Sequence, residues 1–549
     1  MRTDVRDEEL SNLVFCRHLR HIDLTESSVT NKSFVELAKL PRLEWLDLTN
    51  NAIDGIPAVN GFPALTDLVL DGCKIDDDGL RGLTQFPKLD RLRLNESKIS
   101  DEGIETLSQI ENLKSLSLEN DTVSGLRLDL FNGCQHLEFL NFEVASWPAD
   151  SVRQPIDATS PERFETVLND LPKLRTIYTG LYPSLESFQL IDLPELSFVK
   201  VSFLSCPHQA TKKTPYRKCD YCKQRSNLVR LENLPNLADV AIHYAGQIEI
   251  SNSENLETLE LYDVRHFHKK IRQFPKLKNL RIRESTPLSL EELELIGPVP
   301  SLESLTLNLK KLSDESMQVL SLFPNLKRLN IENGIIEGQG IAQIGKLKNL
   351  EELSFHWVKT ETHELDPIQR LSQLKKLKLR GSIDQLNLSG LSKLEFLNID
   401  ADVKSLNLEN LPLLKSVSIY DYNEVNSITL RNLAGLESFR KGCDEDNTLG
   451  FLHVENLPSL QRLNLDHKNP NPDLNTDSLV NIRNSKLLNE LSLRNLTVGE
   501  ETLNAIHSLD RIRILRAVPL EGNEKQFESV TEKVEKQYFS LDAAEGLDN

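Results

Sequence analysis

The sequence lacks the features that mark membrane-spanning and exported proteins. It holds no uninterrupted apolar run long enough to cross a bilayer, so no transmembrane helix is expected. Its first residues, MRTDVRDEELSNLVF, have neither the apolar core nor the small-residue cleavage site of a signal peptide. We therefore expect a cytoplasmic protein with no membrane partner.

Cysteine is scarce and irregularly spaced. The seven cysteines are an odd and scattered set, which does not suit the disulfide framework of a small secreted domain. Free thiols agree with the cytoplasm as the expected compartment.

Catalytic signatures are missing as well. The sequence shows no P-loop, no glycine-rich dinucleotide fingerprint and no Ser/His/Asp or paired-carboxylate constellation that stands apart from its repeats. We expect no enzymatic activity and no small-molecule substrate. The net charge of −19 also argues weakly against general affinity for nucleic acid.

What the sequence does contain is one repeated frame. In LEWLDL, which starts at Leu43, large apolar residues occupy the first, fourth and sixth positions, and the frame returns about every 24 residues. Burial of the apolar side chains of one unit contributes a free energy of roughly 12 kcal/mol. Ordering the residues of that unit costs more, at about 1–2 kcal/mol for each residue. Units must therefore stack to fold. Further copies start at Leu19, Leu65, Leu89, Leu113, Leu137, Leu256, Leu277, Leu302, Leu326, Leu350, Leu374, Leu394, Leu414, Leu436, Leu460, Leu488 and Ile512.

The frame resembles that of the leucine-rich-repeat family, L-x-x-L-x-L-x-x-N/C-x-L. The resemblance implies an α/β repeat solenoid, with a curved parallel sheet on the concave face and short helices or strands on the convex face. It covers about residues 19–518, or about twenty coils, between an N-terminal cap (1–18) and a C-terminal cap helix with an acidic tail (519–549). The ninth position is variable: Ser27, Asn51, Cys73, Ser97 and Asp121.

Two kinds of coil are expected. Units such as IDDDGLRGLTQF, ISDEGIETLSQI, LSDESMQVLSLF and GEETLNAIHSL have helical spacing, with Ser100 and Ser313 at N-cap positions, and resemble the ribonuclease-inhibitor-like branch. Units such as VKSLNLENLPLLKSVSI alternate at period two on both sides of a Leu-Pro turn. That pattern predicts strands on both faces, in flat blocks at roughly 174–261 and 383–454.

The two ends are expected to be helical. Residues 6–16 predict a short helix over the first coil, because a terminal coil would otherwise expose its apolar side. Residues 523–541 place Phe527, Val530, Val534 and Tyr538 on one helical face, which predicts a capping helix.

One insertion, residues 204–227, carries possible metal chemistry. It contains a C-x-H and a C-x2-C pair, and tetrahedral zinc accepts mixed cysteine and histidine ligands. Structural zinc is one interpretation; a flexible loop with incidental thiols and a redox C-x-x-C are the others, and all three stay open. The candidate ligands are Cys206, His208, Cys219 and Cys222. The loop is also basic: Lys212, Lys213, Arg217, Lys218, Lys223 and Arg225.

The concave face is the expected binding surface, because the third, fifth and seventh positions of each frame point to solvent. Early repeats place acids there and late repeats place bases, which suggests an acidic partner for the late patch, although solvated strand faces are also charged. The candidate partner-binding residues are Trp45, Asp47, Arg281, Arg283, Arg328, Lys376, Lys378 and Arg380.

These observations predict a non-catalytic scaffold that binds a protein partner on the concave face. A nucleic-acid-associated protein that uses the basic zinc loop is the alternative from another class, and nucleic acid is not the expected partner. A substrate receptor of a larger ligase complex is a variant of the scaffold hypothesis. The histidines in VRHFHKK (His266, His268) and the cysteine in KGCDEDN (Cys443) are interpreted as loop residues.

Overall fold

The computed structural model describes most of the chain. The described residues are 5–119, 123, 125–143, 164–181, 185–203, 227–264, 274–283, 298–308, 311–312, 317–332, 335–336, 340–360, 365–420, 425–442, 451–465, 476–519 and 524–545. They fall into two compact units, Met1–Leu277 (unit 1) and Lys278–Asn549 (unit 2).

The principal sheet of unit 1 is built from the leucine frame. Each strand starts near the third frame position and pairs in parallel with the strand of the next repeat, so that Leu46, for example, lies opposite Ile22 and Leu68. The strands are β1 (His21–Asp23), β2 (Trp45–Asp47), β3 (Asp67–Val69), β4 (Arg91–Arg93), β5 (Ser115–Ser117), β6 (Phe139–Phe142), β8 (Thr176–Leu181), β10 (Phe198–Phe203), β12 (Asp239–His243) and β14 (Thr258–Tyr262).

A second parallel sheet forms where the sequence predicts the first flat block. Its strands are β7 (Phe164–Leu168), β9 (Leu185–Ile191), β11 (Leu228–Glu232) and β13 (Gln247–Ser251). Strands on both sides of the coil are thereby confirmed. The block begins at β7, before the predicted boundary at 174.

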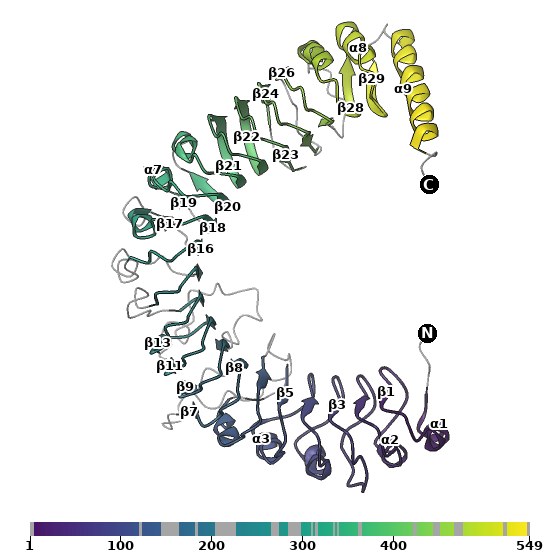
Figure 1. Cartoon of the computed structure of the whole chain (residues 1–549), viewed down its shortest axis with the longest axis vertical. Coiled ribbons are helices and arrows are strands. Elements are labelled where there is room, and N and C mark those ends of the chain that lie inside the picture. Colours follow the sequence, from purple (N-terminus) through teal and green to yellow (C-terminus); the bar gives the residue numbers. More distant parts are fainter. Residues whose placement is uncertain are drawn as a thin grey trace, which may run out of the picture. The chain divides into compact units, whose positions relative to one another are not determined.

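Short helices occupy the other side of the early coils in unit 1, away from β1, β3 and β5 (Figure 1). They are α1 (Asp7–Leu10), η1 (Ser11–Phe15), α2 (Ser33–Leu37), η2 (Asp78–Gln85), α3 (Asp101–Ser108) and η3 (Leu128–Phe131). Ser100 is the N-cap of α3, as predicted, and its hydroxyl accepts a hydrogen bond from the Glu102 amide at 3.2 Å.

The segment from Ile75 is a 3-10 helix, η2, rather than an α-helix. Here the backbone packs tightly against the preceding coil: a Cβ added at Gly82 would lie 2.2 Å from the carbonyl oxygen of Ile56. Ser313, the other predicted N-cap, lies outside the described residues.

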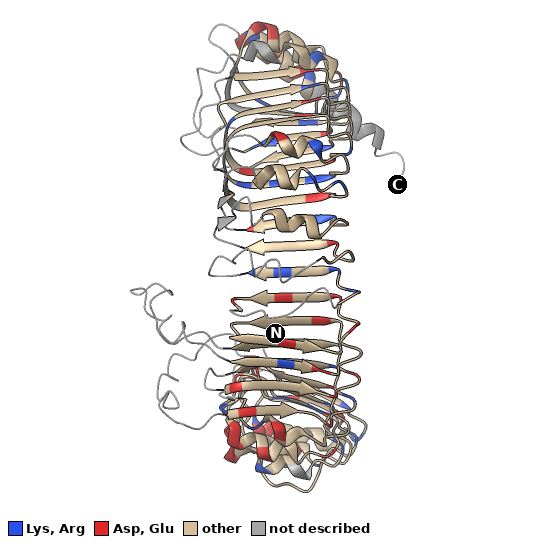
Figure 2. Ribbon diagram, turned by 90° about the vertical axis from the view of Figure 1, so that its left-hand side faces the viewer, with Lys and Arg blue, Asp and Glu red and all other residues tan. Residues whose placement is uncertain are grey.

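Unit 2 repeats the plan of the principal sheet. Its strands are β15 (Asn279–Arg283), β16 (Ser304–Asn308), β18 (Arg328–Glu332), β20 (Glu352–Thr360), β21 (Lys376–Ser389), β22 (Phe396–Glu409), β23 (Ser416–Ile419), β25 (Ser438–Lys441), β27 (Arg462–Leu465), β28 (Glu490–Val498) and β29 (Ile514–Pro519). Figure 2 shows strands stacked as rungs, with basic and acidic positions scattered among uncharged ones.

The second flat block is also present. β21 and β22 are long strands that pair from Lys376–Phe396 through to Ser389–Glu409, and β24 (Ser427–Arg431) and β26 (Phe451–Glu455) extend their second halves. The strands β17 (Lys311–Leu312) and β19 (Ile335–Ile336) also pair with each other. The helices of unit 2 are η7 (Gln318–Leu322), α7 (Gly340–Ile344), η8 (Asp366–Arg370), η9 (Thr476–Asn484), α8 (Glu500–His507) and α9 (Glu524–Glu545).

The frame leucines form the core between the two sides of each coil, and nearly all are fully buried. In unit 1 a row of Phe34, Phe62 and Phe86 joins successive coils, with ring centroids 6.2 and 5.2 Å apart. In unit 2 Lys441 occupies a frame position and is 1% exposed. Among the helices that the structure describes, none has the length and apolarity needed to span a membrane.

Candidate binding surface

The strand register lines outward side chains into rows that cross the principal sheet. In unit 1 the row through Asp47 runs Asp23, Asp47, Val69, Arg93, Ser117, Asn141, Tyr178, Lys200, Ala241 and Glu260. Each member comes from a different repeat, so a surface of this kind exists only in the folded chain.

The predicted residues Trp45 and Asp47 lie side by side in this face of unit 1. The Trp45 ring is half-buried and tilted against His21, with centroids 6.3 Å apart. Asp47 lies opposite Asp23 in register, and its Oδ1 accepts a hydrogen bond from the Thr49 amide at 2.9 Å. Hydrogen bonds from Thr25 hold the pKa of Asp23 below its ordinary value.

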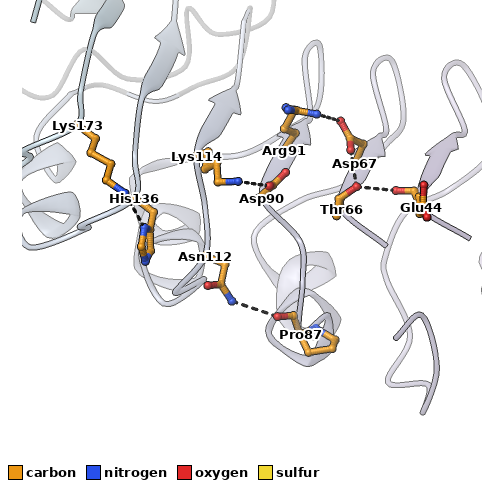
Figure 3. Close-up of polar contacts among 10 residues, drawn as sticks. All are labelled: Glu44, Thr66, Asp67, Pro87, Asp90, Arg91, Asn112, Lys114, His136 and Lys173. Atoms are coloured by element: carbon orange, nitrogen blue, oxygen red, sulfur yellow. Dashed lines mark hydrogen bonds and ion pairs between the residues drawn. The ribbon is translucent and has the colours of Figure 1, made fainter. Parts of the chain in front are cut away.

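The next acids of unit 1 are paired with bases. Arg91 Nη1 lies 2.9 Å from Asp67 Oδ1 (Figure 3), and Arg93 pairs with Asp71. Burial nevertheless raises the pKa of Asp71, because loss of solvent outweighs the opposing effects of the Asn95 amide and the Arg93 guanidinium. The outward face of β3 and β4 therefore carries less net negative charge than its acidic residues alone would give.

Aromatic side chains gather in the middle of unit 1. Tyr178 contacts Phe139 on one side and Phe198 on the other, with ring centroids 5.9 and 4.9 Å away. Lys200 and Glu143 form an ion pair beside this cluster. All three rings are half-buried by their neighbours.

All six predicted basic residues of unit 2 lie on the principal sheet: Arg281 and Arg283 on β15, Arg328 on β18, and Lys376, Lys378 and Arg380 on β21. The alternation along β21 puts its three cations on one face, as the frame requires. Their charges, however, are not equally available.

Three of the six cations are paired with acids of nearby strands. Lys376 Nζ lies 2.8 Å from Glu352 Oε1, and Arg380 Nε lies 2.9 Å from Asp400 Oδ2. Arg283 Nη2 lies 3.3 Å from Glu332 Oε1. Lys378 and Arg328 have no ion-pair partner among the described residues, and both are exposed.

Sequence reasoning missed a feature of the row through Lys378: it contains no acid. In register it runs Arg281, Thr306, Asn330, Ser354, Lys378, Asn398, Ser418, Arg440, Asn464, Ser492 and Arg516. Reading the fifth frame position down the repeats would have revealed this row. Arg440 and Arg516 belong to it and are exposed.

A second missed feature is a ladder of alternating charge at the second frame position, which we call the strand-entry ladder. In unit 2 its ion pairs join Glu303 to Lys327 at 3.0 Å, Glu351 to Lys375 at 2.8 Å and Glu395 to Lys415 at 2.7 Å. In unit 1 Lys114 Nζ lies 2.7 Å from Asp90 Oδ2 (Figure 3).

The strand-entry ladder shifts the pKa values of its members in the expected directions. Hydrogen bonds from Lys375 and Lys415 lower the pKa values of Glu351 and Glu395, respectively, and the same contacts raise those of the two lysines. These perturbed pKa values follow from pairing between repeats, so they do not by themselves indicate a catalytic site.

The candidate zinc ligands Cys206, His208, Cys219 and Cys222 lie outside the described residues, as do His266, His268 and Cys443. Within the part of the chain that the structure describes, no cluster of three or more His, Cys, Asp or Glu side chains has a geometry suited to a metal ion.

Comparison with known proteins agrees with the repeat architecture. The family model described as "Leucine Rich repeat" matches residues 63–83. No curated protein matches the chain.

Several solved structures are similar at low sequence identity. An internalin from Listeria monocytogenes is 18% identical, with a TM-score of 0.38, over 68% of this chain and 88% of that one. A TLR13–ssRNA13 complex is 16% identical, with a TM-score of 0.44, over 94% and 84% of the two chains. The mouse RP105/MD-1 complex is 16% identical, with a TM-score of 0.48, over 95% and 83%.

The identification of the repeats rests on three observations. The L-x-x-L-x-L frame recurs along the sequence, each described copy starts a parallel strand of a principal sheet, and the repeat model matches one of the units. The ribonuclease-inhibitor-like branch remains a prediction. The chain is built of leucine-rich repeats.

Proposed function

We propose that this protein is a non-catalytic, cytoplasmic scaffold that binds a protein partner through the outward face of its principal sheet. The observation that carries the proposal is the alignment of outward side chains into rows across consecutive repeats. Extended surfaces of this type are what repeat proteins use for binding, and the leucine-rich-repeat fold generally mediates protein–protein interaction.

The chemistry of the rows supports a protein partner. Interface hot spots are enriched in tryptophan, tyrosine and arginine, and unit 1 presents Trp45 and Tyr178 while unit 2 presents Arg440 and Arg516. Many charged side chains on the outward face form ion pairs with each other. The cations outside these ion pairs are therefore the ones that can select a partner by its charge.

Site-specific photo-crosslinking tests this proposal in the native cell. A photoreactive side chain at His21 on β1 or Ser418 on β23, neither of which is buried in the principal sheet, should capture a partner. The matched control is Asn387, which is exposed on the second half of β21. Cross-linking only from Asn387, or equally from all three positions, would contradict the proposal.

A second candidate function is nucleic-acid binding through the 204–227 loop. Its six basic residues against a single acid, Asp220, favour contact with phosphates. This function requires salt-dependent binding of DNA or RNA that is lost when the loop is deleted. Photo-crosslinking to protein from the principal sheet would favour the scaffold instead.

A further inference from the structure

Four strands of unit 2 present a row with cations only at its two ends. The row, which we call the Lys378–Arg440 row, consists of Lys378 on β21, Asn398 on β22, Ser418 on β23 and Arg440 on β25, aligned by direct strand pairing. Neither Lys378 nor Arg440 has an ion-pair partner among the described residues, and both are exposed. Within the described part of the chain the row therefore carries two positive charges outside any ion pair, on a protein whose net charge is −19.

The middle of the row has unused hydrogen-bonding capacity. The side-chain amide of Asn398 has no hydrogen-bond partner among the described residues, and its Oδ1 is buried without a donor. The Oδ1 atom is closed to a ligand, but the half-exposed side chain still has its Nδ2 group, which can donate to an acceptor that a ligand supplies.

Two exposed aromatic rings flank this middle portion. Phe396 lies on β22 two residues before Asn398 and is 43% exposed, and Tyr420 follows Ser418 by two residues and is 50% exposed. Large apolar side chains with this exposure are few among the described residues, so their position on either side of one row favours a bound apolar group.

Two acids on the strands next to β21 are already paired. Glu352 pairs with Lys376 and Asp400 pairs with Arg380, so they do not compete for Lys378. The positive potential of the row is consequently directed outward, toward a ligand.

We propose that the Lys378–Arg440 row binds an extended peptide segment of the pattern acidic–x–apolar–x–acidic, and this rests on the scaffold function proposed above. Three strand spacings of about 4.8 Å separate Lys378 from Arg440, or about 14 Å. Four residues of extended chain cover roughly that distance, at about 3.3–3.4 Å each. Residues i, i+2 and i+4 of such a segment point to the same side.

The geometry assigns each of those side chains a site. The two carboxylates reach Lys378 and Arg440, and the apolar side chain between them enters the space flanked by Phe396 and Tyr420. The backbone carbonyls of an extended segment are unpaired and accept hydrogen bonds from the Asn398 side-chain amide and the Ser418 hydroxyl. A nucleic acid fits less well because it carries a phosphate at every nucleotide, and the two central positions of the row have no cation.

Fluorescence anisotropy with the full chain and synthetic labelled peptides tests the assignment. The probe has the centre Glu-Ser-Phe-Ser-Glu; its matched controls have Gln for both Glu residues, or Gly for Phe. We expect binding of the first peptide, with affinity reduced at least tenfold for each control and reduced by added salt.

Charge reversal in the protein locates the site. Lys378→Glu and Arg440→Glu should each weaken binding about tenfold. Lys348→Glu is the control, since Lys348 is likewise exposed and without an ion-pair partner among the described residues but lies in the turn before β20, outside the row. It should change the affinity less than twofold.

Three results of the peptide-binding experiments would overturn the assignment. The first is that Lys378→Glu and Arg440→Glu both bind the peptide with unchanged affinity. The second is that the unmodified chain does not bind the peptide at all. The third is tighter binding of single-stranded oligouridylate than of peptide, lost in the same variants. If the photo-crosslinked partner remains bound to the doubly reversed protein, the scaffold function stands and this assignment fails. If no partner is captured from the principal sheet, the scaffold function itself fails.

Discussion

At the scale of single residues, the ninth frame position shows what one side chain does for a coil. Asn51 is 6% exposed, and its Nδ2 donates to the carbonyls of Leu24 and Leu48 at 2.7 and 2.9 Å. Its Oδ1 accepts from the Val29 amide at 3.4 Å. In the next coil Cys73 takes the same place, and burial raises the pKa of its thiol. These residues satisfy backbone groups in the turn, where strand pairing ends.

Replacing Asn51 should therefore destabilise unit 1. Asn51→Ala leaves buried carbonyl and amide groups without partners, so we expect a loss of about 1–3 kcal/mol in the free energy of unfolding, measured with urea. Asn112→Ala is the control, because that exposed side chain donates only to the Pro87 carbonyl (Figure 3). It should cost no more than about 0.5 kcal/mol. Equal losses in the two variants would argue against this role.

The cysteine and histidine residues of the insertion support a second residue-scale prediction. If Cys206, His208, Cys219 and Cys222 hold structural zinc, the purified chain should contain one equivalent of the metal by mass spectrometry. Cys219→Ser should lose the zinc but keep the unfolding midpoint of the repeats, because the insertion interrupts the frame without contributing to it. Cys16→Ser, at an exposed cysteine outside the insertion, should retain zinc. Zinc-free protein with reactive thiols would support the flexible-loop interpretation.

At the scale of strands, pairing between repeats brings charges of opposite sign together. The strand-entry ladder alternates sign at one frame position, so each glutamate of its inner rungs lies between two lysines. Glu395, for example, is stabilised by Lys415 and, more weakly, by Lys375. The ladder thus favours correct stacking of successive strands and disfavours a register that brings like charges together.

The ladder should contribute stability that depends on pH and salt. The pKa of Glu395 lies below its ordinary value of 4.5, so its contribution is complete above that value and is lost as pH falls through the lower, folded pKa. Glu395→Gln should lower the urea midpoint at neutral pH. The difference from the unmodified chain should shrink in acid and at high salt, because exposed pairs are screened.

Two further variants separate pairing from other effects. Glu395→Lys combined with Lys415→Glu should recover part of the stability lost in Glu395→Lys alone. Glu254→Gln, at an exposed carboxylate in a turn and without an ion-pair partner among the described residues, should leave the midpoint unchanged. A midpoint difference in Glu395→Gln that persists below the glutamate pKa would exclude the pairing explanation.

At the scale of the whole molecule, a stack of coils needs its end covered. In unit 2, α9 packs against α8 and β29 beyond the last repeat (Figure 1). Val530 is 1% exposed at this contact, and Lys533 Nζ donates to the Leu509 carbonyl at 3.3 Å. The helix covers apolar surface that every earlier coil buries against a neighbour.

Undocking α9 should loosen the end of unit 2. Val530→Asp places a carboxylate in the buried contact, so we expect faster hydrogen exchange in α8 and β29 and easier proteolysis before α9. Ser529→Asp adds the same group at the exposed neighbouring position and should change neither measurement. Unchanged exchange in Val530→Asp would mean that α9 does not protect the last coil.

The sequence by itself determined the repeat and the approximate places of the two flat blocks. The frame leucines predict where strands start, and period-two alternation predicts both flat blocks, because these patterns depend only on which side chains a short segment must bury. The terminal helix α9 also lies where its apolar spacing predicts, although it extends to Glu545.

Only the tertiary structure decided which charges are available to a partner. Lys376, Lys378 and Arg380 look alike along β21, yet the first and third are paired with Glu352 and Asp400, from the repeats on either side. The partners are separated by 24 and 20 residues, so their contact depends on strand register and on how far each side chain reaches. Lys378 remains unpaired because its neighbours in register are Ser354 and Asn398, and a local pattern contains no information about those neighbours until the coils are stacked.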